Sequence, residues 1–304
     1  MNVEDTWQLG WRGITADVPL PWALSKVEGT AESGYLRLDD ESMPRLELRW
    51  GPSPGRKKSL ADLTENYLKQ ARKLARKMRV PFDYSHRQRF FPAKGREVCY
   101  LTLQSDYASH IIVSRCKQCG RIVLARILHQ PGEDVAATVA MVFGSLRDHA
   151  YQGEITWSVF DLRARLPETF DLISSTFQVG QIRLAFRRGK DRLVLDRHNF
   201  ARELLRETNL KHWLVYSLRK ELRPFVISSD EWQHRGHEGV LLSGSLKLWR
   251  RLMTLDLKPR RLSALAWRCD ESDRLFAIRL LTRKPDDEEL ARLAKSMECH
   301  ERSD

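Results

Sequence analysis

The sequence predicts an α+β protein built of two tandem repeats, each a mainly antiparallel sheet flanked by helices. Its 304 residues exceed the usual size of one domain. Short segments of alternating apolar and polar residues, joined by hairpin-length turns, indicate antiparallel strands. Blocks of similar sequence recur in the same order in the two halves, so we expect one repeat at residues 1–150 and a second at residues 151–304.

The first pair of blocks aligns residues 12–24 with residues 160–172 without gaps. In both, apolar residues recur at every second position until a proline, Pro19 or Pro167, which is typical of a half-buried strand that ends there. The further pairs are residues 34–38 with 180–184, 45–48 with 192–195, and 115–128 with 268–281. Agreement of several blocks in one order indicates a duplication.

A helix is expected between the blocks of the first half. Ser59 and Asp62 have the spacing of a capping box, which predicts a helix that begins there and continues to about residue 79. Its apolar stripe recurs at steps of three and four residues and consists of Leu60, Leu63, Tyr67, Ala71, Leu74 and Met78.

The second half is expected to contain a longer helix, capped by Asn199 and ending before Pro224. Each half then returns to strands and closes with a helix, at residues 133–149 and at about residues 286–297. The turn residues between positions 229 and 237 predict a loop there.

This order of motifs resembles the Mog/PsbP-like fold. The resemblance rests on a strand that ends in Pro19-x-x-Trp22 or Pro167-x-x-Phe170, a hairpin built around residues 34–38 or 180–184, a helix, further strands and a closing helix. It covers nearly all of the chain, once per half, and implies an α/β/α sandwich. Proteins of that fold mostly act as accessory or binding subunits and share no common catalytic residues, so the resemblance implies a binding role and assigns no functional residue.

The composition is that of a basic globular protein, with 42% hydrophobic and 30% charged residues and a formal net charge of +12. Such a charge favours anionic partners such as nucleic acid or acidic proteins. The N-terminal residues lack a basic leader and an apolar run, and no segment approaches the length of a membrane-spanning helix. The five cysteines are an odd number, which favours reduced thiols. We therefore expect a cytoplasmic protein.

A basic segment at residues 56–91 is one candidate binding surface. Arginine and lysine would meet phosphates there while bases stack on the aromatic residues of positions 82–91. The competing interpretation, which we favour, is that the charges keep a helix solvated and the rings belong to the core. The candidate residues are Arg56, Lys57, Lys58, Lys69, Arg72, Lys73, Arg76, Arg79, Arg87 and Arg89.

Cys116 and Cys119 have the spacing of half a zinc site, in which a tight turn directs two thiolates at one metal ion. The other two ligands would come from distant positions, and the candidates are His86, Cys99, His110 and the pair Cys299-His300. The second repeat keeps only the first cysteine, Cys269, with Ser272 in place of the second. Cys116 and Cys269 are therefore also expected as small buried residues at a strand end.

Trp232 and Trp249 lie in less regular segments than the other tryptophans and are candidate interface residues. His234 and His237 are the nearest approach to a catalytic cluster, but we expect them to be solvated in a loop. The sequence contains no phosphate-binding loop, GxGxxG, GxSxG or HExxH motif.

The leading functional hypothesis is a non-enzymatic binding or adaptor protein that recognises a macromolecular partner, most simply a protein, through its paired repeats. One alternative is a nucleic-acid-binding protein that uses the basic segment at residues 56–91. Another is an enzyme or small-ligand protein with a site between the repeats.

Overall fold

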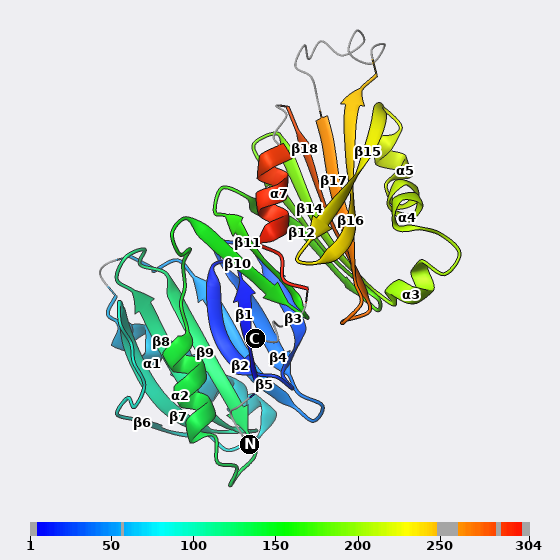
Figure 1. Cartoon of the computed structure of the whole chain (residues 1–304). Coiled ribbons are helices and arrows are strands. Elements are labelled where there is room, and N and C mark those ends of the chain that lie inside the picture. Colours follow the sequence, from blue (N-terminus) through cyan, green and yellow to red (C-terminus); the bar gives the residue numbers. More distant parts are fainter. Residues whose placement is uncertain (1–4, 56–57, 248–260, 284–286, 300–304) are drawn as a thin grey trace. The chain divides into compact units, whose positions relative to one another are not determined.

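The computed structural model describes residues 5–55, 58–247, 261–283 and 287–299 (Figure 1). Contacts divide the chain into two units: the first holds the residues up to Tyr151 together with Ser158–Phe160, and the second holds Gln152–Trp157 and the residues from Asp161 onward. The predicted α+β class is confirmed, because every described strand pairing is antiparallel and helices accompany the sheets. None of the helices in the described part is long and apolar enough to cross a membrane.

The first unit contains a hairpin and a seven-stranded sheet with the strand order β3-β4-β5-β9-β8-β7-β6. The hairpin is formed by β1 (Thr6–Trp11) and β2 (Ile14–Pro19), which ends at the predicted proline. The sheet strands are β3 (Ala23–Gly29), β4 (Gly34–Asp39), β5 (Pro44–Gly51), β6 (Asp83–His86), β7 (Arg96–Gln104), β8 (Ala108–Cys116) and β9 (Ile122–His129).

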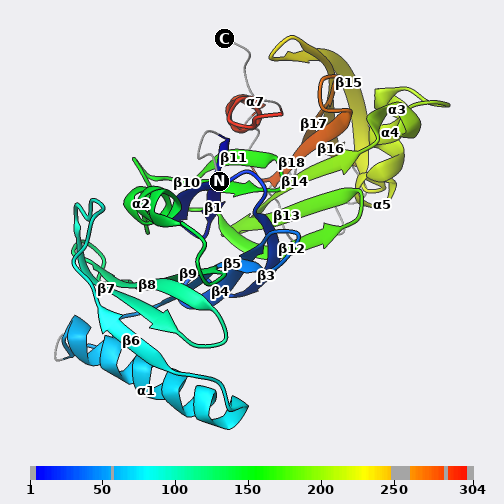
Figure 2. The same cartoon turned by 90° about the horizontal axis from the view of Figure 1, so that it is seen from below.

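Two helices cover opposite faces of this sheet (Figure 2). On one face, Leu68 of α1 (Leu60–Met78) packs against a cluster that includes Leu101 and Leu103 of β7. On the other, the ring of Tyr100 meets that of Phe143 from α2 (Ala136–Ser145), with centroids 6.5 Å apart. Neighbouring residues of a strand point to opposite faces, so β7 alone contributes to both layers of the core.

Helix α1 begins where the sequence predicts. The Ser59 side chain accepts a hydrogen bond from the Asp62 amide at 3.0 Å, and the Asp62 carboxylate accepts one from the Ser59 amide at 2.9 Å. The helix ends at Arg79, whose φ of 58° is left-handed and turns the chain out of the helix. The predicted capping box is confirmed.

The second unit contains most of β10 (Glu154–Val159), β11 (Leu162–Pro167) and a seven-stranded sheet with the order β12-β13-β14-β18-β17-β16-β15. The sheet strands are β12 (Asp171–Gln178), β13 (Gln181–Arg188), β14 (Asp191–Asn199), β15 (Phe225–His234), β16 (His237–Leu246), β17 (Arg261–Cys269) and β18 (Arg274–Thr282). The two sheets have the same strand order. In each, the first three strands lie side by side in chain order, and the last four lie beside them in reverse chain order.

The prediction of one long helix after Asn199 is wrong. Asn199 is the last residue of β14, and the chain forms three short helices instead, α3 (Ala201–Leu204), α4 (Leu210–Ser217) and α5 (Arg219–Leu222). The cap of α4 is Asn209, whose side chain accepts a hydrogen bond from the His212 amide at 2.9 Å. A second good capping residue within the segment allows the helix to restart there.

Helices again cover both faces of the second sheet (Figure 1). Leu214 and Leu222, of α4 and α5, pack in a cluster with Ala264 and Ala266 of β17. The closing helix α7 (Asp287–Lys295) contacts β17 and β18, and in Figure 1 it lies on the other side of the sheet from α4 and α5. The closing helix of the first unit is shorter than the expected 133–149, because α2 spans Ala136–Ser145 only. The closing helix of the second unit, α7, ends at Lys295, close to the expected end at about residue 297.

Replacing Ser59 with alanine removes the acceptor that satisfies the Asp62 amide. We expect the free energy of opening of α1 to fall by about 0.5–2 kcal/mol. Hydrogen exchange measured by mass spectrometry on α1 peptides checks this, with peptides of α4 as an internal control. Ser59→Asn keeps an acceptor and should leave exchange nearly unchanged; equally fast exchange in both variants would show that the cap does not stabilise α1.

Candidate functional site

The basic residues predicted as a binding surface fall into two groups. Arg56 and Lys57 lie outside the described residues. Lys58 precedes α1, and the exposed side chains of α1 and its C-terminus include Lys69, Arg72, Lys73, Arg76 and Arg79. Arg87 and Arg89 instead follow β6, where the Arg87 side chain donates to the hydroxyl of Thr102 at 3.3 Å. The main cationic surface of this segment is therefore α1 itself.

The aromatic residues of the segment are mostly engaged within the first unit. The Arg72 guanidinium lies 5.3 Å from the ring centroid of Phe82 and 5.8 Å from that of Tyr84, and both rings pack against the Leu68 cluster. Phe91 is buried, with its ring 5.4 Å from that of Phe143. These contacts agree with the interpretation that the rings belong to the core.

A hollow of about 220 Å³ lies between α1 and the sheet, and we call it the α1 groove. Leu74 and Met78 line it, and their side chains are 57% and 55% exposed. The remaining lining comes from α1, from the segment after it, and from β5, β7 and β9 with the turn that follows β7; it includes Tyr67, Gln70, Ala71, Val80, Phe82, Leu103, Leu124, Arg49 and Arg126. The groove therefore combines an apolar floor with charged edges.

Trp249, one of the two candidate interface tryptophans, lies outside the described residues. Trp232 lies on β15 and is half-buried. Its ring stacks on that of His234, with centroids 5.3 Å apart, and lies 6.0 Å from that of Trp267. Trp232 thus belongs partly to the packing of the second unit.

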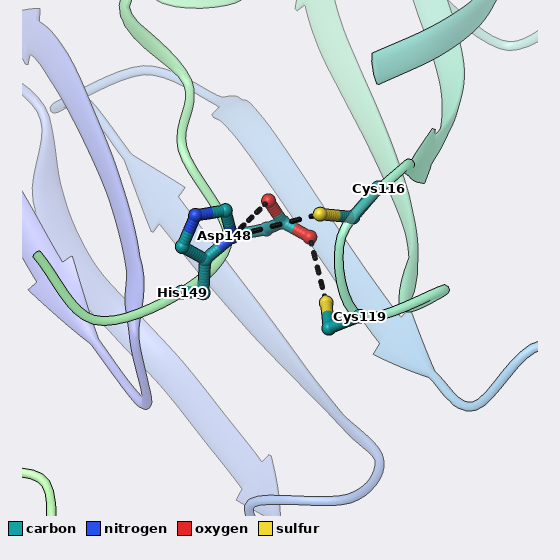
Figure 3. Close-up of side chains that lie close together, drawn as sticks. All are labelled: Cys116, Cys119, Asp148 and His149. Atoms are coloured by element: carbon teal, nitrogen blue, oxygen red, sulfur yellow. Dashed lines mark hydrogen bonds and ion pairs between the residues drawn. The ribbon is translucent and has the colours of Figure 1, made fainter. Parts of the chain in front are cut away.

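Four potential metal ligands come together at one end of the first sheet. The side chains of Cys116, Cys119, Asp148 and His149 turn toward one another (Figure 3), and their ligand atoms all lie within 4.8 Å of one another. Cys116 Sγ is 3.5 Å from His149 Nδ1, Cys119 Sγ is 3.7 Å from Asp148 Oδ2, and His149 Nδ1 is 3.2 Å from Asp148 Oδ1. We call this group the Cys116 cluster.

The turn between β8 and β9 positions the two thiols. The Gly120 amide donates to the Cys116 carbonyl, and the Cys116 amide donates to the Arg121 carbonyl, both at 3.0 Å. The φ of Gly120 is 74°, a left-handed conformation that glycine adopts without strain. The Arg121 side chain also donates to the Asp148 carbonyl at 3.1 Å, and so connects this turn to the segment after α2.

The sequence pattern did not point to Asp148 and His149. The ligands it proposed lie elsewhere: His86 and Cys99 pair with each other at 3.7 Å, and Cys299 belongs to the second unit. His110 contacts the Tyr100 hydroxyl at 2.5 Å, and burial, with neighbouring His129 and Arg87, lowers its pKa to about 4. His300 lies outside the described residues. An acidic residue directly followed by histidine after a closing helix was the available signal.

The second unit holds a related group of donors, formed by His237, Cys269 and Cys299. All three residues are buried, and burial with the neighbouring Cys269 raises the pKa of the Cys299 thiol to about 12. The expectation that His234 and His237 are solvated is wrong, because they flank the tight turn of the β15–β16 hairpin and are 2% and 8% exposed. Burial lowers the pKa of His234 to about 4.

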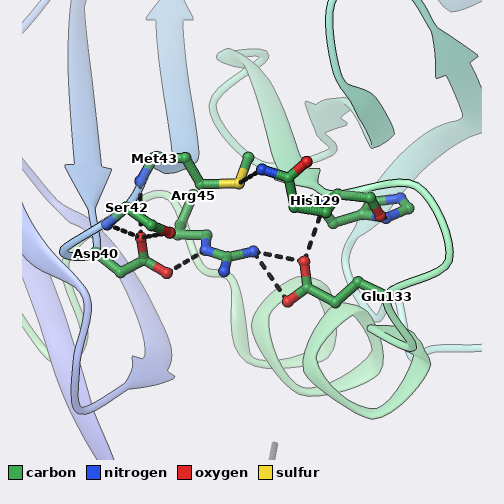
Figure 4. Close-up of polar contacts among 7 residues, drawn as sticks. Asp40, Ser42, Met43, Arg45, His129 and Glu133 are labelled. Carbon is green, nitrogen blue, oxygen red and sulfur yellow. Dashed lines mark hydrogen bonds and ion pairs between the residues drawn. The ribbon is translucent and has the colours of Figure 1, made fainter.

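An arginine connects two turns of the first unit (Figure 4). The Arg45 side chain, 8% exposed at residue level, ion-pairs with Asp40 at 2.5 Å and with Glu133 at 2.8 Å. Burial alone would raise the pKa of Asp40, but hydrogen bonds from Arg45, Ser42 and Met43 outweigh it and lower that pKa to about 2. The pKa of Glu133 is also lowered, since bonds from Arg45 and Gln130 outweigh its burial.

No protein-family model matches the chain, and no curated protein does. Among solved structures, the T6SS immunity protein TplEi from Pseudomonas aeruginosa is 9% identical over 97% of this chain and 98% of that one, with a TM-score of 0.33. The Ran-binding protein Mog1p from Saccharomyces cerevisiae is 11% identical over 48% of this chain and 85% of that one, with a TM-score of 0.30. The likeness is weak and concerns the fold alone.

Asp40→Asn removes the charge that Arg45 binds. We expect a loss of about 1.5–3 kcal/mol in the free energy of unfolding at pH 7, the usual worth of a hydrogen bond to a charged group. Because the pKa of folded Asp40, about 2, lies below its ordinary value of 3.8, its contribution is present above that ordinary value and is lost as the pH falls toward 2. Urea unfolding at pH 7 and near pH 3 measures both effects.

Glu41→Gln is the matched control, since it neutralises an exposed neighbouring carboxylate. We expect it to leave the unfolding free energy within about 0.5 kcal/mol of the unaltered chain. A deficit in Asp40→Asn that does not shrink toward acid pH would contradict the role given to the ion pair.

Proposed function

We propose that this chain is a non-enzymatic binding protein that recognises a protein partner through the α1 groove of its first unit. The observation that carries the proposal is the exposure of Leu74 and Met78 beside a hollow of about 220 Å³. Two large apolar side chains more than half exposed in one concave surface are typical of a site that another molecule covers. A helix beside a sheet offers such a groove to an extended or helical segment of a partner.

The charges around the α1 groove indicate the chemistry of that segment. Six exposed cations lie on α1 and at its C-terminus: Lys69, Arg72, Lys73, Arg76, Lys77 and Arg79. The acidic residues at the groove, Glu47 and Asp106, both pair with Arg126, at 3.6 and 3.4 Å. The lining itself is balanced, because Glu47 and Asp106 lie beside Arg49 and Arg126, so the excess positive charge comes from the α1 cations outside the lining. This charge favours a partner segment that places an apolar side chain in the groove and acidic residues over α1.

The same cations would also attract nucleic acid, but the rings give little support to base stacking. One side of Phe82 and Tyr84 is occupied by Arg72 and the Leu68 cluster. Phe90 is 51% exposed, yet its ring lies 5.7 Å from those of Phe91 and Tyr100. Single-stranded binding needs rings that bases can cover. A protein segment therefore fits this surface better than a nucleic acid does.

We also propose that the two units are copies of one Mog/PsbP-like repeat. The equal strand orders of the two sheets support this, as do the aligned blocks, which fall on β2 and β11, β4 and β13, β5 and β14, and β9 and β18. A duplicated unit would allow the second copy to bind a further part of the same partner. The cytoplasmic location and the alternative of an enzymatic or small-ligand site between the repeats stay predictions.

Leu74→Ser should weaken binding without unfolding the protein. Peptides selected from a random displayed library against the full chain are expected to be acidic with an apolar residue, and Leu74→Ser should lower their affinity about tenfold or more, since a buried leucine is worth about 1.5–3 kcal/mol. Fluorescence anisotropy of a labelled selected peptide measures the change. The stability should stay within about 0.5 kcal/mol, as usual for an exposed position.

Leu20→Ser is the matched control, because Leu20 is 56% exposed on the first unit but does not line the groove. Equal loss of affinity in both variants, or selected peptides without acidic residues, would overturn the proposal. A random single-stranded oligonucleotide serves as a second probe. Tighter, steeply salt-dependent binding of the oligonucleotide, unchanged by the neutral Leu74→Ser, would assign the surface to nucleic acid instead.

A further inference from the structure

We propose that the Cys116 cluster binds one zinc ion, with Cys116, Cys119, Asp148 and His149 as its four ligands. All four residues belong to the first unit, on the β8–β9 turn and on the segment after α2. The site is independent of the α1 groove. It completes the half site that the two cysteines form in the sequence.

The spacing of the ligand atoms matches tetrahedral zinc. With sulfur about 2.3 Å and nitrogen or oxygen about 2.0–2.1 Å from the metal, neighbouring ligand atoms of a tetrahedron are about 3.3–3.8 Å apart. The distances in the Cys116 cluster are 3.5 Å from Cys116 Sγ to His149 Nδ1 and 3.7 Å from Cys119 Sγ to Asp148 Oδ2. These two ligand pairs are thus already separated as they would be around one ion, and all four ligand atoms lie within 4.8 Å of one another.

The ligand types favour zinc over magnesium and calcium. Thiolates and imidazole suit zinc, whereas magnesium and calcium prefer oxygen ligands alone. On binding, each cysteine thiol loses its proton to solvent, and the carboxylate and the neutral imidazole contribute lone pairs. Four protein ligands leave no open position for water or substrate, so the site is structural and not catalytic.

A buried arginine beside the cluster would balance the charge of the zinc centre. Two thiolates and one carboxylate around a divalent ion leave one net negative charge. Arg96 lies directly opposite Cys116 in the β7–β8 ladder and is 7% exposed. Its Nη2 donates to the Phe143 carbonyl at 3.0 Å, but its buried Nε and Nη1 lack a hydrogen-bond partner. A buried guanidinium with two unpaired nitrogens is unfavourable, and an anionic zinc centre nearby would offset that cost.

The test compares zinc content in the full chain and its variants. Each protein is reduced, stripped with a chelator, reloaded with zinc sulfate and desalted, and its zinc is measured by atomic emission. We expect the unaltered chain to hold one equivalent more than the double variant Cys116→Ser, Cys119→Ser. The difference is informative even if the second unit also binds metal. Cys99→Ser, a cysteine outside the cluster, should retain the full content.

His149→Ala provides a variant that should fold, because the His149 side chain is 43% exposed. Loss of a residue that hydrogen-bonds a metal ligand typically lowers metal affinity by roughly 10–100-fold. Loss of His149, a direct ligand, should lower the zinc affinity by at least as much. Competition with a chromophoric chelator measures it, and cobalt in place of zinc should give the strong visible absorption of tetrahedral thiolate coordination. Equal zinc in the unaltered chain and the double variant, or unchanged affinity in His149→Ala, would overturn the proposal.

Discussion

The central strands β8 and β17 of the two seven-stranded sheets are buried on both faces, and covering both faces is the constraint on which the rest of each unit depends. β17 shows it most directly, since six consecutive residues, 262–267, are buried. A half-solvated strand would alternate between buried and exposed residues.

The helices cover the two sheets unequally. Three short helices follow the second sheet closely, whereas the single straight helix α1 contacts the first sheet mainly at β7 and β8. The uncovered margin beside α1 is where Leu74 and Met78 remain exposed, so the α1 groove is a consequence of how one straight helix covers a wide sheet.

A buried arginine, Arg45, and a partly exposed one, Arg188, connect the hairpins of the two sheets to the closing segments. In the first unit Arg45 joins the β4–β5 turn to Glu133 before α2, and in the second Arg188 joins the β13–β14 turn to Glu289 of α7 at 2.7 Å. Burying a cation is costly unless its donors are satisfied, and a bidentate carboxylate satisfies two at once. A guanidinium can reach across a turn in this way without a tightly packed apolar contact. The closing segments are held by charge as well as by their apolar faces.

The sequence predicted those features that depend on neighbouring residues. The α+β class, the strand that ends at Pro19 and the capping box of Ser59 follow from local patterns that the tertiary structure does not oppose. The helix after Asn199 was wrong because several capping residues competed, and only packing on the sheet decides between them. His234 and His237 were assigned to a solvated loop because their segment is polar, yet a tight turn places both inside the unit. The sequence predicted two of the four residues of the Cys116 cluster, because the turn holds two cysteines three residues apart. Asp148 and His149 follow 29 or more residues later, and only the fold brings them to the cysteines.

Turns at corresponding places in the two strand orders hold different chemistry. The turn after β8 and the turn after β17 each begin with a cysteine, and in each unit the segment after the closing helix meets it. In the first unit that segment brings a carboxylate and a partly exposed imidazole, and the turn adds a second thiol, so four donors converge near the surface. In the second, Ser272 stands where the second thiol would be, and the three donors come from buried residues. In the first cluster Cys119 and His149 are exposed, which gives a metal ion access from solvent, whereas all three donors of the second cluster are buried. The first cluster, with an arginine on the opposite strand to balance its charge, is therefore the one whose geometry favours a metal, while the donors of the second are enclosed within its unit.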